Sequence, residues 1–135
     1  ALKLLAAKSP QTIRVLPNDK LHHKDAKVTV EISGIANRAL VLFNIAGDGT
    51  VQLLYPIASD PVLVRSADYR LPVQVREPFG SDLVVAVTSE QPMPMLEQAL
   101  RSVNQRRSAL AALKIVERYR PIDGRIGATG IFTAP

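Results

Sequence analysis

Two apolar runs joined by a glycine-containing turn constrain the fold of this chain more than any other feature. Residues 40–55 read LVLFNIAGDGTVQLLY, so stretches rich in β-branched and aliphatic residues flank the Gly-Asp-Gly of 47–49. Glycine accepts the positive φ angles that reverse a chain within a few residues. We therefore expect 39–45 and 50–55 to pair as an antiparallel hairpin. The first run is apolar on both faces apart from Asn44, which predicts a central strand covered on both sides.

Further short apolar runs lie between turn residues. Residues 27–33 alternate strictly between apolar and polar side chains, which is typical of a strand with one solvated face. Prolines flank 11–16, and Pro72 lies inside 69–75, so both segments are predicted at sheet edges. The intervening segments 18–27 and 57–67 are predicted loops. The remaining strands are expected over 82–89 and 125–133.

The pattern changes after Pro94. Residues 95–103 and 106–119 place apolar side chains at helical spacing, with a possible break at Asn104 and Gln105. We therefore expect one or two helices before the last strand. The predicted fold is mainly β, a mostly antiparallel β sandwich of immunoglobulin-like or related type, with this helical insertion near its C-terminal end.

Length and composition agree with a single domain. The chain has 135 residues, a mass of 14.7 kDa and 47% hydrophobic residues, enough for one core, and no apolar run approaches the ~18 residues of a membrane span. It starts at Ala1 with LKLLAAKSP, which lacks a full signal-peptide layout and resembles the cut end of a longer protein. We expect 1–10 to be a residual linker from an upstream part and 11–135 to be one β-rich accessory domain.

One loop gathers side chains that could bind a metal or take part in catalysis. His22 and His23 lie near Asp19 and Asp25, but adjacent side chains diverge, and a zinc site needs three or four converging ligands. The chain has no cysteine and no HExxH spacing. A solvated charged loop is therefore the favoured interpretation, with no metal or cofactor, and an enzyme with an unrecognised site here is the alternative.

Other candidate motifs lack essential parts. No GxSxG surrounds Ser81, which would be the nearest nucleophile. The turn at 47–49 has no distal glutamate for a calcium loop, and 124–130 lacks the lysine of a phosphate-binding loop. We assign no catalytic residue.

The second predicted helix carries a basic face. Arg107, Lys114 and Arg118 fall within about 40° on a helical wheel, and the chain has a net charge of +5 with a pI near 9.9. They are the candidate binding residues, for an anion or nucleic acid. Nucleic-acid sites usually add interleaved aromatic residues, which are missing here, so a solvated helix face is the favoured interpretation.

Three segments carry a resemblance to a known family. They are ALVLFNIAGDGTVQLLYP (39–56), YRLPVQVREPFGSDLVVAVTSEQP (69–92) and RIGATGIFTA (125–134). In this order they resemble a bacterial domain family of unknown function that is often found C-terminal to caspase-like peptidase domains and in envelope-associated proteins. The resemblance covers most of 25–134. The matching fold-forming positions are Asp48, Gly49, Tyr55, Pro56, Pro78, Phe79, Gly80 and Asp82.

The resemblance implies a non-catalytic accessory module of a larger bacterial protein, periplasmic or extracytoplasmic. The caspase Cys–His pair cannot lie in this chain, because it has no cysteine. The expected partner is another protein or an upstream domain of the same chain, and nucleic acid is not expected. The expected contact surfaces are the edge strands at 11–16 and 69–75, by addition of a partner strand, and the basic helix face.

Overall fold

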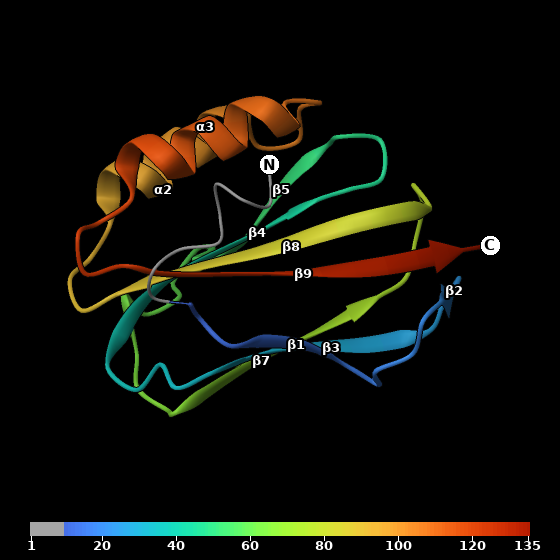
Figure 1. Cartoon of the computed structure of the whole chain (residues 1–135), viewed down its shortest axis with the longest axis horizontal. Coiled ribbons are helices and arrows are strands. Elements are labelled where there is room, and N and C mark those ends of the chain that lie inside the picture. The colour runs from blue at the N-terminus through green and yellow to red at the C-terminus, as the bar shows by residue number, and fades with distance from the viewer. Residues whose placement is uncertain (1–9) are drawn as a thin grey trace.

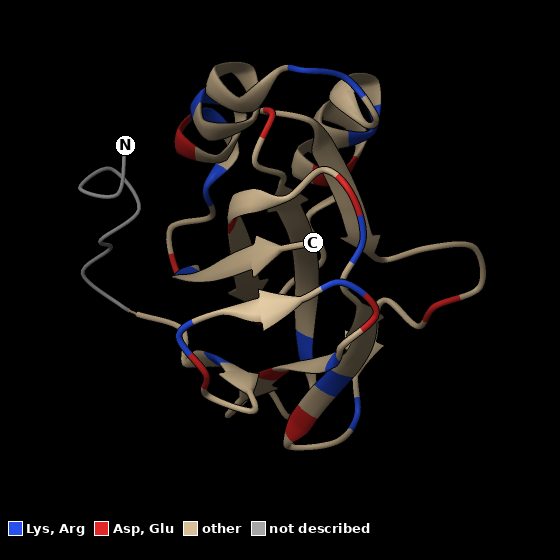
Figure 2. Ribbon diagram, turned by 90° about the vertical axis from the view of Figure 1, so that its right-hand side faces the viewer, with Lys and Arg blue, Asp and Glu red and all other residues tan. Residues whose placement is uncertain are grey.

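The computed structural model describes residues 10–135, which form three layers. Two helices cover one face of a large sheet, and a small sheet packs against its other face (Figures 1 and 2). The helices are α2 (Pro94–Val103) and α3 (Ala109–Tyr119). The large sheet contains β2 (His22–His23), β4 (Arg38–Ile45), β5 (Val51–Tyr55), β6 (Leu63–Val64), β8 (Gly80–Ser89) and β9 (Arg125–Ala134). The small sheet contains β1 (Ile13–Leu16), β3 (Lys27–Ser33) and β7 (Asp68–Gln74).

The large sheet has the order β2-β9-β8-β4-β5, with β6 paired to the start of β4, and the small sheet has the order β1-β3-β7. All pairs are antiparallel except β2 with β9. The predicted mainly β sandwich with helices inserted before the last strand is confirmed. Both predicted edge strands, β1 and β7, lie at the edges of the small sheet.

The hairpin of β4 and β5 is confirmed. All eight residues of β4 are buried, and β4 lies between β5 and β8. In the turn, the Ala46 amide donates to Thr50 O at 2.9 Å, and Gly49 has a φ of +89°. A side chain at Gly49 would be strained at this angle, so a glycine allows the tight return of the chain.

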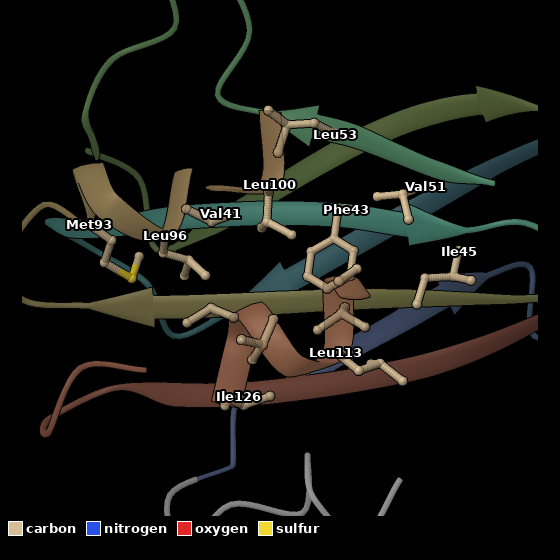
Figure 3. Close-up of a cluster of buried hydrophobic side chains, with 14 of the residues drawn as sticks. Val41, Phe43, Ile45, Val51, Leu53, Met93, Leu96, Leu100, Leu113 and Ile126 are labelled. Carbon is tan, nitrogen blue, oxygen red and sulfur yellow. The ribbon is translucent and has the colours of Figure 1, made fainter. Parts of the chain in front are cut away.

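Alternation along β4 divides the interior into two cores. Val41 and Phe43 face the helices, where they pack with Leu96 and Leu100 of α2 (Figure 3). Leu42 faces the small sheet and joins the second core, which lies between the sheets. The central strand is therefore covered on both sides, as its composition predicts.

Three details differ from the expectations. The predicted loop at 57–67 contains β6, whose backbone pairs with the start of β4, and the predicted loop at 18–27 contains β2, which pairs with the end of β9. The second helix starts at Ala109 and not at 106, because 105–107 pair with the β5 side of the molecule. The predicted linker 1–10 lies outside the described residues except for Pro10, which bridges to Ile126.

None of the helices in 10–135 is long and apolar enough to span a membrane.

Candidate functional site

Strand β7 has an outer edge that no described strand covers. Within residues 10–135, β7 pairs only with β3. Just beyond β7, the Val75 amide donates to Ala26 O at 3.0 Å, and Val75 O accepts the Asp25 amide at 2.9 Å. Both backbone groups of Val75 therefore point toward β3. Because these directions alternate along a strand, the backbone groups of Gln74 and Arg70 point outward. We call this the open edge.

The edge of the large sheet on the same side is covered. The Val51 amide of β5 donates to Arg106 O at 2.8 Å, and Val51 O accepts the Gln105 amide at 2.7 Å. The Leu53 amide donates to the Asn104 side-chain oxygen at 2.8 Å. The segment between α2 and α3 thus satisfies both outward groups of Val51 and the outward amide of Leu53. We call this the covered edge.

A cleft of about 300 Å³ lies between the sheets, where β7 and β5 approach each other. This volume is at the lower end for sites that hold a small molecule or one side chain. Its walls are mostly apolar, and its polar groups come from Asn44, Gln52 and Asp82 and from the segment after β7. The apolar wall residues are Val28, Val30, Ala46, Leu54, Val73, Val75, Pro78, Val84 and Ile131.

The polar groups of the cleft are partly satisfied by one another. The Asn44 amide nitrogen donates to Gln52 Oε1 at 3.0 Å and to Asp82 Oδ2 at 3.1 Å, and Asp82 Oδ1 accepts the Gly47 amide at 3.0 Å. Burial raises the pKa of the Asp82 carboxyl, whereas the hydrogen bonds that it accepts from Asn44 and Gly47 lower this pKa. Asn44 Oδ1 is buried and accepts no hydrogen bond from residues 10–135. The polar wall of the cleft is therefore held together by hydrogen bonds among its own side chains.

The outer face of the small sheet is polar, as the alternation of 27–33 predicts. At its centre the Glu31 carboxylate accepts hydrogen bonds from the Arg14 and Arg70 guanidinium groups, at 2.5 and 2.8 Å. These arginines cover Glu31 and hold its pKa below the usual range, with Arg14 the larger cause. The two ion pairs also connect both edge strands to the central strand of the sheet.

The three basic candidates do not form one helix face. Arg107 precedes α3, where its backbone bridges to Thr50 and its guanidinium lies 3.6 Å from Asp48. Lys114 and Arg118 lie one turn apart on the exposed side of α3, and the Arg118 guanidinium lies 5.5 Å from the centre of the Tyr119 ring. The prediction that Arg107 shares the face of the other two is wrong, since the helix begins after it.

The two histidines diverge as predicted. His22 is buried, and His23 is exposed with its Nδ1 3.3 Å from Pro135 O. No three metal-ligating side chains of 10–135 come together in a group that could hold a metal ion. Ser81 is exposed on β8.

Comparison with protein-family models, curated proteins and solved structures gives no match to this chain. The resemblance described for most of 25–134 therefore stays a prediction.

Sequence reasoning placed β7 at an edge but missed the cleft and the covered edge. Asn44, the one polar residue in an otherwise apolar run, was the available signal for the cleft. The residue types at 104–106 do not indicate that this segment pairs with β5, because the pairing depends on how α2 docks on the sheet.

Proposed function

We propose that this chain is a non-catalytic interaction module that binds an extended segment of a protein partner by strand addition to β7. The observation that carries the proposal is the open edge, whose outward backbone groups have no described partner. Unpaired groups on an edge strand are a ready template for an incoming strand.

The open edge sets the form of the contact. Arg70 and Gln74 each offer an amide and a carbonyl, whereas Pro72 between them has no amide and offers only its carbonyl. An added strand therefore gains a short ladder with a gap in its middle. This gap disfavours indiscriminate pairing of long flat strands, which edge prolines generally prevent.

The cleft supplies a place for a side chain of the added strand. Val73 and Val75 line it from the β7 side and Leu54 from the β5 side. A strand laid along β7 points alternate side chains toward the space between the sheets. Backbone pairing would then give affinity, and the cleft would select the residue that enters it.

The proposed setting is an accessory domain of a larger bacterial protein, exported to the periplasm, in which the partner strand comes from an upstream domain or from a second protein. The segment resemblance supports this setting, and it includes caspase-like proteins among the candidate parents. In that arrangement, catalysis belongs to another part of the parent protein.

The test screens the chain against immobilised ten-residue peptides, both random peptides and peptides that tile the parent protein. Binding is measured for the unaltered chain and for Gln74→Pro, which removes an outward amide. We expect Gln74→Pro to weaken binding by about tenfold, because one backbone hydrogen bond to the added strand is lost and the ring hinders approach.

Gln74→Ala is the matched control, since it changes the same side chain but keeps the amide. It should bind nearly as well as the unaltered chain. Amide shifts of the bound state should be largest at Arg70 and Gln74. Equal binding by the proline and alanine variants, or shifts confined to α2 and α3, would exclude strand addition to β7.

A further inference from the structure

A buried positive charge lies at the end of the sandwich opposite the cleft. Arg38 is only 8% exposed, yet no carboxylate of residues 10–135 lies within 4.0 Å of its guanidinium. Its Nε donates to Thr88 Oγ1 at 3.3 Å, and one amino group donates to Thr88 O and Asp123 O at 3.3 and 3.4 Å. All three acceptors are uncharged. Buried charges are normally paired, so this one needs explanation.

The nearest carboxylate is engaged elsewhere. The Asp123 Oδ1 atom accepts the Ser89 hydroxyl at 3.0 Å, and its Oδ2 accepts the Glu90 amide at 3.4 Å. Asp123 therefore meets Arg38 through its backbone carbonyl. The other amino group of Arg38, Nη1, donates to no described residue.

Arg38 lines a shallow hollow of about 550 Å³ together with a second arginine, Arg125. The Arg125 guanidinium makes one hydrogen bond, to Gly34 O at 3.5 Å, and no ion pair with residues 10–135. Burial lowers the pKa of Arg38 and the positive charge of Arg125 lowers it further, while the carboxylates of Asp123 and Glu90 act in the opposite direction. Both arginines thus line one open space, and their charges are close enough to interact. The rest of the lining is Gly34, Ala36, Asn37, Ala67 and Glu90.

We propose that this hollow binds a carboxylate group, held by Arg38 and Arg125. A carboxylate matches the planar guanidinium fork and would give Arg38 a directly bonded counter-charge, which no carboxylate of residues 10–135 provides. Glu90 also lines the hollow, where its charge weakens the attraction of the two arginines for an anion.

The test follows amide NMR shifts while sodium acetate replaces sodium chloride at constant ionic strength and neutral pH. We expect saturable shifts at Gly34, Asn37 and Arg125. Arg125→Ala should weaken acetate binding about tenfold, as loss of a charge-assisted hydrogen bond predicts. Glu90→Gln should tighten it about two- to threefold, because repulsion at an exposed rim is small. Arg118→Ala is the control, an exposed arginine on α3 that should leave binding unchanged.

Acetyl-Gly-Glu-Gly-amide distinguishes the source of the carboxylate. Binding tighter than that of acetate indicates an acidic peptide, and equal binding indicates a small organic acid. Shifts that grow without saturation, equal weakening by Arg118→Ala and Arg125→Ala, or sulfate binding more tightly than acetate would each overturn the proposal. Should Arg125→Ala unfold, Glu90→Gln still tests the charge of the ligand, because a neutral or cationic ligand would not bind more tightly after loss of this negative charge.

Discussion

The outer edges of β5 and β7, on one side of this sandwich, differ in how their backbone groups are hydrogen-bonded. At the covered edge, the segment between α2 and α3 accepts and donates the outward hydrogen bonds of Val51 and Leu53. At the open edge, Arg70 and Gln74 point their backbone groups outward without a described partner. The helical insertion therefore does more than cover the large sheet. It also closes one of two adjacent edges and leaves the other without a described strand partner.

The largest expected effect comes from loosening the helix that holds the covered edge. Leu100 is fully buried between α2 and the large sheet. Leu100→Ala should lower the free energy of unfolding by about 2–5 kcal/mol, through lost burial and the cavity left behind. Denaturant unfolding measures this change. Hydrogen exchange should also become faster at Val51 and Leu53 and stay the same at Leu71 and Val73 of β7, whose amides point toward β3.

Met95→Ala is the control for that variant, since Met95 lies on the same helix but is 66% exposed. It should change stability by no more than about 0.5 kcal/mol. Equal acceleration of exchange at both edges after Leu100→Ala would mean that they are not independent.

A smaller effect is expected from the side-chain part of the covered edge. Asn104→Ala removes the oxygen that accepts the Leu53 amide, and it leaves a partly buried donor without its partner. The free energy of unfolding should fall by about 1–3 kcal/mol. Asn104→Asp keeps an oxygen acceptor and should retain most of the stability. Denaturant unfolding of both variants checks this, and equal losses would show that the hydrogen bond is not the cause.

Glu31 and Asp82 should give pH dependences of opposite sign. The folded pKa of Glu31 is lowered by its arginines, so its stabilisation is present above the usual glutamate range and is lost as the pH falls through the folded pKa. The folded pKa of Asp82 is raised by burial, so its protonation favours the folded state. Stability from Asp82 therefore increases as the pH falls below the raised pKa.

Urea unfolding between about pH 3 and pH 7, the range of carboxyl titration, separates the two. Glu31→Gln should reduce the loss of stability in acid, whereas Asp82→Asn should steepen it. If the free energy of unfolding of Glu31→Gln falls in acid as much as that of the unaltered chain, the ion pairs at the outer face of the small sheet do not control acid stability.

Much of the fold could be predicted because its local patterns agree with the tertiary structure. The alternation of 27–33 and the turn at 47–49 each act within a few residues, and both predict the observed strands. The break at Asn104 was also visible. The start of α3 was predicted too early because the helical spacing continues back to 106, while pairing with β5 keeps 105–107 out of the helix. A long-range contact decides this boundary.

The candidate sites were harder to predict for the same reason. Arg38 reads in the sequence as an ordinary charged residue between a turn and a strand. Its burial depends on β8 and on the loop before β9, which supply Thr88 and Asp123. The cleft likewise needs both sheets in place. Spacing along one segment carries no information on such convergence.

The smallest expected effect concerns an ion pair beside the covered edge. Glu97 and Arg101 lie one turn apart on α2 with 2.9 Å between their charged groups, and Arg101 also donates to Pro56 O at 3.1 Å. Both side chains are partly exposed, so the pair should contribute only about 0.3–0.5 kcal/mol.

A double-mutant cycle with Glu97→Gln and Arg101→Gln isolates that coupling from the bond to Pro56, because the latter is lost in both variants that lack Arg101. The coupling should decrease at high salt, where exposed charges are screened. A salt-independent coupling above about 1 kcal/mol, beyond the usual range of exposed pairs, would show that the pair is shielded from solvent. Arg101 would then belong with Asn104 among the side chains that keep the covered edge closed. The difference between the covered edge and the open edge would then depend on side chains as well as on backbone pairing.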